Sequence, residues 1–367
     1  MVSVTFVSGI TGTYTTDSGG IMRKILIAAV LIMFLASSVS ALDITAPAVP
    51  ESGRKYMPRE TDNLLEGIAE VLRSAIYNLR PDIREAARVC TGVTASILAC
   101  SFLSAIPAAS GKITDMICVI AVASQLLSAA NSLIRLGSDT IVQISEYGKL
   151  LLPVMTGAMA AGGGVTGSTV LYALTAVLDS VLSTLIANVL TPMIYVYLAL
   201  SSAGAALGED LLKKLRGMIK GVCVWLIKTL LYVYTGFLSI TGVVAGTTDA
   251  AAMKAAKLTI SGAVPVVGGI LSDASEAFLV GIGTVKNAAG LYGLFAILSI
   301  WIGPFLRIGA HYLILKATGA LCSVFCRKPI TELLEDFTAA MGLLLGMTGA
   351  ECLTLVISTI CFMKGVG

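Results

Sequence analysis

Charged side chains are scarce in this 367-residue chain, and their scarcity is the first constraint on its fold. Asp, Glu, Lys and Arg make up 13% of the residues, whereas hydrophobic residues make up 56%. Soluble domains carry about 25% charged residues, which they need to cover their surface. With a mean hydropathy of +0.90, much of this chain must face a solvent other than water. The composition therefore excludes an ordinary soluble domain.

The residues and motifs of common enzymes are also missing. The chain has one histidine, His311, with no nucleophile or carboxylate near it in sequence, and it contains no Walker A, HExxH or GxSxG motif. We therefore expect no enzyme activity, no catalytic residues and no cofactor. The net charge of +3 is small and dispersed, so nucleic acid is not an expected partner.

Paired cysteine motifs are absent although the chain has eight cysteines. Cys322 and Cys326 stand one helical turn apart, a spacing that could support a metal or a disulfide. No acidic ligand is near them, and the other cysteines fall mostly within apolar runs. We favour inert, buried thiols over a metal site.

The first 41 residues read as an export signal with an upstream extension. The basic pair Arg23-Lys24 precedes an apolar run over 25–35 and the small residues Val39-Ser40-Ala41, the pattern of a secretory signal peptide. Met22 stands directly before the basic pair, so translation could begin there and leave 1–21 as an artefact. An uncleaved membrane anchor is the alternative.

Residues 42–87 are expected to form an extracytoplasmic linker followed by an amphipathic helix. Three prolines fall between 42 and 60. From about 63 to 79, apolar residues recur at helical spacing, and Pro81 ends this helix and opens the next. The helix could lie on the membrane surface, dock onto a partner, or pack against the protein's own spans.

Residues 88–367 are expected to be an all-α, polytopic transmembrane domain in the lipid bilayer. A span needs about 20 apolar residues, and seven to nine such spans are predicted. Their positions are about 88–110, 113–134, 149–164, 168–190, 192–208, 221–246, 288–306, 307–326 and 338–362. Glycines four residues apart, as at Gly204 and Gly208, favour close helix packing.

The orientation rests on two basic regions that conflict. Lys213, Lys214, Arg216 and Lys220 form the densest basic cluster, which we assign to the cytoplasm. The exported segment before residue 88 is also rich in arginine, although the positive-inside tendency would keep basic residues in the cytoplasm.

Two carboxyl residues lie in the middle of predicted spans, Asp179 in 168–190 and Glu351 in 338–362. A charge at the bilayer centre costs about 2.5–3.5 kcal/mol. Each side chain should therefore face the bundle interior, be protonated, or pair with a cation such as Lys228, Arg307 or Lys316. They are candidates for a polar pathway or an ion-coupled site, with a structural hydrogen bond between helices as the favoured alternative.

An interrupted segment at about 247–287, with re-entrant geometry as one option, holds the other candidates. The candidate helix break is Pro265, Gly268 and Gly269, and the candidate polar positions are Asp249, Lys254, Lys257, Asp273, Lys286 and Asn287. Broken helices line substrate and ion sites in transporters. An interfacial loop without a pathway is the plain alternative.

Three stretches of the sequence, VAGTTDAAAMKAAK, VPVVGGILSDASEAF and VKNAAGLYGL, closely resemble the stage III sporulation protein AE family. The resemblance is strong from Lys228 to Gly346, and about a third of the chain carries the specific match. The family offers no established catalytic residues.

The resemblance implies a membrane subunit of a channel complex between mother cell and forespore, similar to a secretion apparatus and required for endospore formation. The implied partners are the other stage III sporulation proteins of the AA–AH set and stage II sporulation protein Q. The implied location is the mother-cell membrane around the forespore, the outer forespore membrane. A self-contained, ion-coupled secondary transporter is the alternative, and a scaffold for ring-forming partners is the third option.

We predict that Asp273→Ala or Lys257→Ala impairs sporulation while the protein stays in the membrane, because each removes a polar side chain from the interrupted segment. Heat-resistant spore counts and a membrane immunoblot measure the two effects. Normal spore yield from both variants would contradict a functional role for this segment.

Overall fold

The structure is a computed structural model that describes residues 46–59, 64–106, 111–161, 165–208, 210–240, 288–323 and 326–364. All of them belong to one compact unit, Ile44–Gly367. The described residues are almost entirely helical and include no strand. The all-α fold predicted from the sequence is confirmed.

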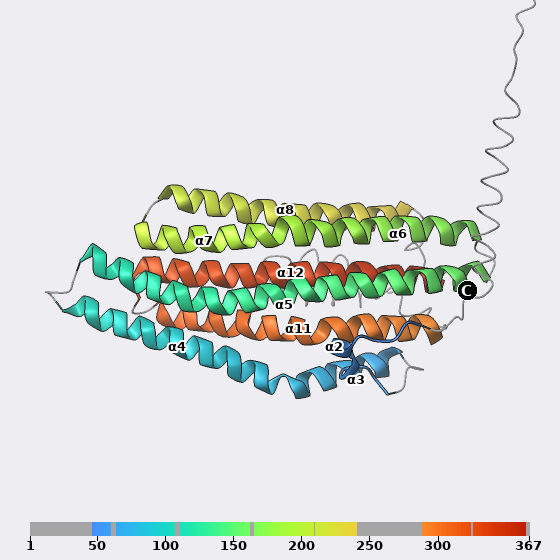
Figure 1. Ribbon diagram of the computed structural model, residues 1–367, viewed down its shortest axis with the longest axis horizontal. Helices are drawn as coiled ribbons and strands as arrows, with labels where there is room; N and C mark the ends of the chain where they lie inside the picture. The colour runs from blue at the N-terminus through green and yellow to red at the C-terminus, as the bar shows by residue number, and fades with distance from the viewer. Residues whose placement is uncertain are drawn as a thin grey trace, which may run out of the picture. The chain divides into compact units, whose positions relative to one another are not determined.

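Long helices lie side by side within this unit (Figure 1). The helices are α2 (Glu51–Arg54), α3 (Leu64–Asn78), α4 (Arg80–Ala105), α5 (Lys112–Ala161), α6 (Val165–Leu185), α7 (Thr191–Leu207), α8 (Asp210–Ile240), α11 (Ala288–Cys322) and α12 (Lys328–Lys364). A short π-helical turn, η1 (Ile186–Leu190), joins α6 to α7 without a break.

Helix α12 is the centre of the bundle. It packs against α5, α6, α7, α8 and α11, and 94% of its most apolar window is buried by the other helices. The corresponding figure for α8 is 22%. The helices other than α12 therefore form the surface that meets lipid.

Six helical segments of the described residues are long and apolar enough to cross a membrane. They are Arg80–Leu103, Lys112–Ala158, Leu171–Leu207, Leu212–Gly236, Ala289–Cys322 and Lys328–Met363. The protein is thus a polytopic helical membrane protein, as the sequence predicts.

The segment boundaries differ from the predicted ones because three pairs of predicted spans are continuous helices. The predicted spans 113–134 and 149–164 are separated by a stretch with the exposed charges Arg135, Asp139 and Glu146, but these recur on one face of α5, which runs through them without a break. Pro153 and Pro304 lie inside α5 and α11 without ending them. Proline removes one backbone hydrogen bond, which membrane bundles tolerate when neighbouring helices satisfy the freed group.

The turn η1 explains how the chain passes Pro192 without a break. A proline ring clashes with the carbonyl four residues earlier. Directly before Pro192, the N–H of Thr191 bonds the carbonyl of Ile186, a spacing of five residues. This wider turn makes room for the ring, so the predicted spans 168–190 and 192–208 are one helical rod.

Helix α5 is much longer than a bilayer is thick. Its 50 residues extend about 75 Å at 1.5 Å per residue. The hydrocarbon core of a bilayer is about 30 Å thick, and the usual tilt of about 20° shortens the projected length only slightly. Part of α5 therefore extends beyond the hydrocarbon layer.

The amphipathic helix expected near 63–79 is α3, and one edge of it packs on α11. Gly67 lies against the ring of Phe295, and a Cβ added there would come within 2.2 Å of that ring. Val71 and Ala75 are also buried. Packing on the protein's own span, one of the alternatives above, is therefore confirmed for this edge. The opposite edge leaves Ile76 63% exposed.

Several sequence predictions lie outside the described residues. They are the upstream residues and signal peptide at 1–41, and the interrupted segment with Asp249, Lys254, Lys257, Pro265, Gly268, Gly269, Asp273, Lys286 and Asn287. They stay predictions, as does the proposed division of the chain at residues 41 and 87.

We expect Gly67→Ala to loosen α3 from α11 because the added methyl would overlap the buried Phe295 ring. Overpacking of this kind costs about 1–3 kcal/mol. Faster trypsin cleavage at the exposed Arg73 in the detergent-solubilised protein would report it. Gly217→Ala on α8 is the control: its Cβ would meet nothing within 4 Å, and alanine stabilises a helix by about 1 kcal/mol relative to glycine. Equal cleavage rates in both variants would contradict the tight contact.

Candidate functional site: a buried carboxyl pair

Asp179 and Glu351 come together in the interior of the bundle. Asp179 lies on α6 and is 1% exposed, and Glu351 lies on α12 and is 0% exposed. Helices α6 and α12 pack against each other, and the two carboxyl groups are close enough to interact electrostatically. Both residues were singled out separately in the sequence, and the structure places them in one site, called here the carboxyl site.

Hydrogen bonding at the carboxyl site is incomplete. The Ser145 hydroxyl on α5 donates to Oδ2 of Asp179 at 2.8 Å. Apart from the interaction between the two carboxyl groups themselves, Oδ1 of Asp179 and both carboxyl oxygens of Glu351 have no hydrogen-bond donor among the described residues. Thr175, one helical turn before Asp179, is also fully buried with an unbonded hydroxyl. The site thus collects polar oxygens that a proton or a small cation could bridge.

Tyr234 ties α8 to α12 beside the carboxyl site. Its hydroxyl donates to the carbonyl of Thr354 at 2.9 Å and contacts the hydroxyl of Ser358. Asp179 is close enough to act electrostatically on Tyr234. Four helices, α5, α6, α8 and α12, therefore supply polar groups to this region, and each is held in place by at least one of these bonds or contacts.

In the described part of the chain, none of the cations suggested by the sequence, Lys228, Arg307 and Lys316, makes an ion pair with either carboxyl group. Arg307 bonds both carboxylate oxygens of Glu85 on α4, at 2.8 and 2.9 Å. Lys316 lies over the ring of Tyr312 on its own helix. The cation whose charge acts on both carboxyl groups is the exposed Lys149 of α5.

A second polar cluster joins α7, α8 and α12 near the α7–α8 turn. Arg216 is 5% exposed and pairs with Asp336. The hydroxyls of Tyr197 and Ser201 on α7 both donate to the same carboxylate at 2.7 Å. Asp336 therefore interacts with one cation and two hydroxyls. These contacts hold α7, α8 and α12 together, so this cluster has a structural role.

The turn beside this cluster depends on Gly208, which ends α7 in the left-handed region with φ 73°. Its N–H bonds the carbonyl of Gly204 at 2.9 Å, as in many helix C-caps. Gly208 thus serves as a cap, whereas the Gly204/Gly208 spacing suggested helix packing.

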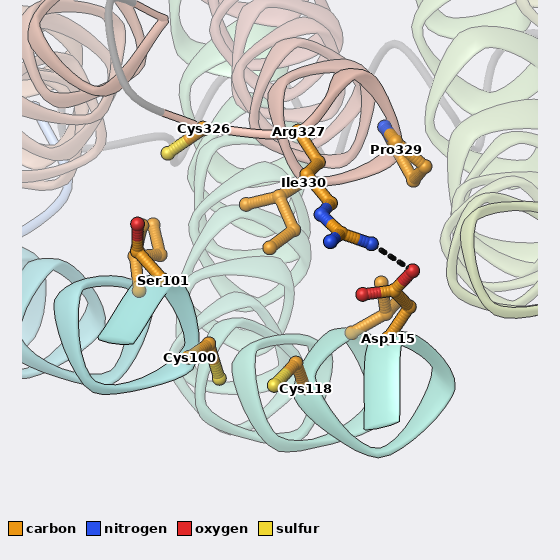
Figure 2. A pocket seen from close by; sticks show the side chains of 10 residues that line it. Cys100, Ser101, Asp115, Cys118, Cys326, Arg327, Pro329 and Ile330 are labelled. Atoms are coloured by element: carbon orange, nitrogen blue, oxygen red, sulfur yellow. Dashed lines mark hydrogen bonds and ion pairs between the residues drawn. The ribbon is translucent and has the colours of Figure 1, made fainter. Parts of the chain in front are cut away.

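A cavity of about 280 Å³ lies where the end of α4 meets the starts of α5 and α12 (Figure 2). The ion pair between Asp115 and Arg327 crosses it. The sulfurs of Cys100 and Cys118 point toward one another across the α4–α5 interface (Figure 2). Burial, with a smaller contribution from Cys322, raises the pKa of Cys326 at this cavity to about 12. Its thiol is therefore protonated and weakly reactive at neutral pH.

Metal binding finds no support in the part of the chain that the structure describes. No group of three or more His, Cys, Asp or Glu side chains there could hold a metal ion. Seven of the eight cysteines are buried, and Cys326 is partly buried. His311 is buried and its Nδ1 lies 2.9 Å from the carbonyl of Arg307.

The sequence indicated the two carboxyl groups but not their surroundings. Ser145, Thr175 and Tyr234 were not singled out, since hydroxyl residues in apolar helices are common and carry no spacing signal. The Arg216–Asp336 pair was also missed, because its residues are 120 positions apart.

The structure defines a class: a multi-pass helical membrane protein with its polar groups concentrated inside the bundle, around α12. A family model for stage III sporulation protein AE matches residues 82–367. The chain belongs to this family, which associates it with sporulation.

The stage III sporulation protein AE of Bacillus subtilis (strain 168) is 20% identical to this chain over 209 residues. The alignment covers 57% of this chain and 52% of that relative, so the chain matches about half the length of the curated relative. No solved structure matches the chain.

We predict that Arg216→Met destabilises the protein by about 3 kcal/mol, because it leaves the Asp336 carboxylate in the bundle without its cation. Thermal unfolding of the detergent-solubilised protein measures this loss. The double variant Arg216→Met/Asp336→Leu should recover most of it. Lys213→Met, which removes only the exposed pair with Glu332, should change stability by about 0.5 kcal/mol or less. An unchanged unfolding temperature for Arg216→Met would show that the Arg216–Asp336 pair does not stabilise the bundle.

Proposed function

We propose that this protein is a membrane subunit of a channel complex between mother cell and forespore, located in the mother-cell membrane around the forespore. The supporting observation is the family match, which runs from the beginning of α4 to the end of the chain. That region contains nearly all of the six candidate membrane spans. The proposed partners are the stage III sporulation proteins of the AA–AH set and stage II sporulation protein Q.

The packing of the bundle favours a subunit over a complete channel. The helices gather around α12, whose apolar window is almost entirely buried by protein. A centre filled with side chains leaves little room for a wide conduit. Passage of a substrate would then require surfaces contributed by partner subunits. Energy would come from a separate ATPase, because this chain has no nucleotide-binding motif.

The carboxyl site favours a second candidate, ion-coupled movement within the same subunit. Two carboxylates placed together at low dielectric repel each other. A proton or small cation between Asp179 and Glu351 would relieve that repulsion. Lys149 at the edge of the site would respond to the change in charge. Charge changes at such buried pairs drive conformational steps in pumps and transporters.

Deletion of the gene in the native host tests the main proposal. We expect normal vegetative growth and a block after engulfment, scored as a loss of heat-resistant spores. Complementation with Glu351→Gln or Asp179→Asn then tests the carboxyl site, since these changes keep the side-chain shape but prevent ionisation. If ion coupling is essential, both variants should fail as completely as the deletion while remaining in the membrane.

Glu335→Gln is the matched control, because Glu335 is an exposed carboxyl group on the same helix, α12. It should restore sporulation fully. Full rescue by Glu351→Gln and Asp179→Asn would reject ion coupling and leave the subunit proposal standing. Unimpaired sporulation of the deletion strain would reject the subunit proposal itself.

A further inference from the structure

One face of α5 remains uncovered by the rest of the bundle although it carries small and charged residues. This face, called here the α5 stripe, consists of Ser124, Ser128, Ser132, Arg135, Asp139, Glu146 and Lys149, all of them exposed. On one side α4 borders it, where Gln125 bonds Ser96 at 2.7 Å. On the other side α7 borders it, where Tyr195 bonds Asn131 at 2.9 Å. The stripe therefore lies open between α4 and α7.

The first half of the α5 stripe has the composition of a helix–helix contact in lipid. Ser124, Ser128 and Ser132 follow one another at intervals of four residues, so they lie on one face. Small residues at this spacing let two membrane helices approach closely. They fall within 116–134, a stretch of about 28 Å that has no charged residue.

The second half of the α5 stripe carries charges that have no partner in the described part of the chain. Arg135, Asp139, Glu146 and Lys149 make no ion pair with another described residue. Their signs are positive, negative, negative, positive along the helix, so the net charge is zero. A surface of balanced charge does not attract anionic lipid headgroups or nucleic acid as a basic patch does. It suits a protein surface of complementary pattern.

We propose that the α5 stripe binds the α5 stripe of a second copy of this chain, with the two helices parallel and related by a two-fold axis along the membrane normal. Arg135 then meets Asp139 of the second copy, one turn away, and Glu146 meets Lys149 of the second copy. Two-fold symmetry repeats each pair, which gives four opposite-charge contacts. The serines let the two helices approach closely along the first half of the stripe.

The parallel arrangement follows from membrane insertion and from the charge order. Copies inserted in one membrane with one topology present α5 in the same direction. A centred antiparallel pair would place Arg135 opposite Lys149 and Asp139 opposite Glu146, so like charges would meet. In the parallel pair each charge lies opposite its own copy and one turn from an opposite charge, so the favourable contacts are the diagonal ones between neighbouring turns. This inference does not depend on the proposed role in a channel complex.

Cysteine cross-linking in membranes of the native host tests the contact. The full-length Ser128→Cys variant, treated with a short bismaleimide, should give a band at twice the mass of the chain. Leu313→Cys on α11 is the control, because its side chain is 62% exposed but lies outside the stripe, and it should give no such band. The wild-type protein measures the background cross-linking of the native thiols. Ser132→Cys provides a second position in case Ser128→Cys disturbs the contact. Absence of a dimer band from both serine variants, with normal protein levels, would overturn the proposal.

Charge exchange in the Ser128→Cys background identifies the occupant. Arg135→Asp or Asp139→Arg alone should remove most of the dimer band, because like charges would then meet. The double variant Arg135→Asp/Asp139→Arg should restore it, since opposite charges meet again between two identical copies. A heterologous partner would not be restored by the exchange. Failure of the double variant, or a cross-link to a different protein, would refute the second copy as the occupant.

Discussion

Two carboxyl groups on α12, Asp336 and Glu351, are shielded inside the bundle, and the contacts that shield them join α12 to the helices around it. Near its beginning, Asp336 is held by Arg216 of α8 and by two hydroxyls of α7. Further along, Glu351 is buried against Asp179 of α6, beside Ser145 of α5. Apolar packing alone does not fix the register of helices in lipid, because lipid tails are as apolar as leucine side chains. These polar contacts do.

The carboxyl groups of the two polar clusters differ in how completely they are hydrogen-bonded. Asp336 has a cation and two hydroxyl donors, so its contribution is to hold α7, α8 and α12 together. At the carboxyl site the Ser145 hydroxyl donates only to Asp179, and apart from the interaction between the two carboxyl groups themselves three carboxyl oxygens have no donor among the described residues. A buried polar group that is left incomplete costs free energy. A proton held between the two carboxyl groups would lower that cost, which is the physical basis of the ion-coupling proposal above.

Much of the fold could be predicted because its signal is bulk hydrophobicity, which depends on composition over about 20 residues. The helical class, the amphipathic α3 and the burial of Asp179 and Glu351 all follow from that signal. The sequence did not predict that pairs of neighbouring spans form single continuous helices, because Pro153, Pro192 and Pro304 each suggest a helix end when only the local sequence is considered. Whether a proline ends a helix depends on neighbouring helices and on a wide turn such as η1. Pairing of the carboxyl groups was equally beyond prediction, since 172 positions of chain separate Asp179 from Glu351 (351 − 179 = 172).

The length of α5 has a consequence for the space next to the membrane. A helix of about 75 Å crossing a core of about 30 Å leaves roughly 45 Å of rod outside the core, counted over both sides of the membrane. Because α11 and α12 pack along α5, the projecting part is a braced column and not a flexible tether. Such a column acts as a spacer: it sets a lower limit on how closely a facing bilayer can approach wherever this protein stands upright.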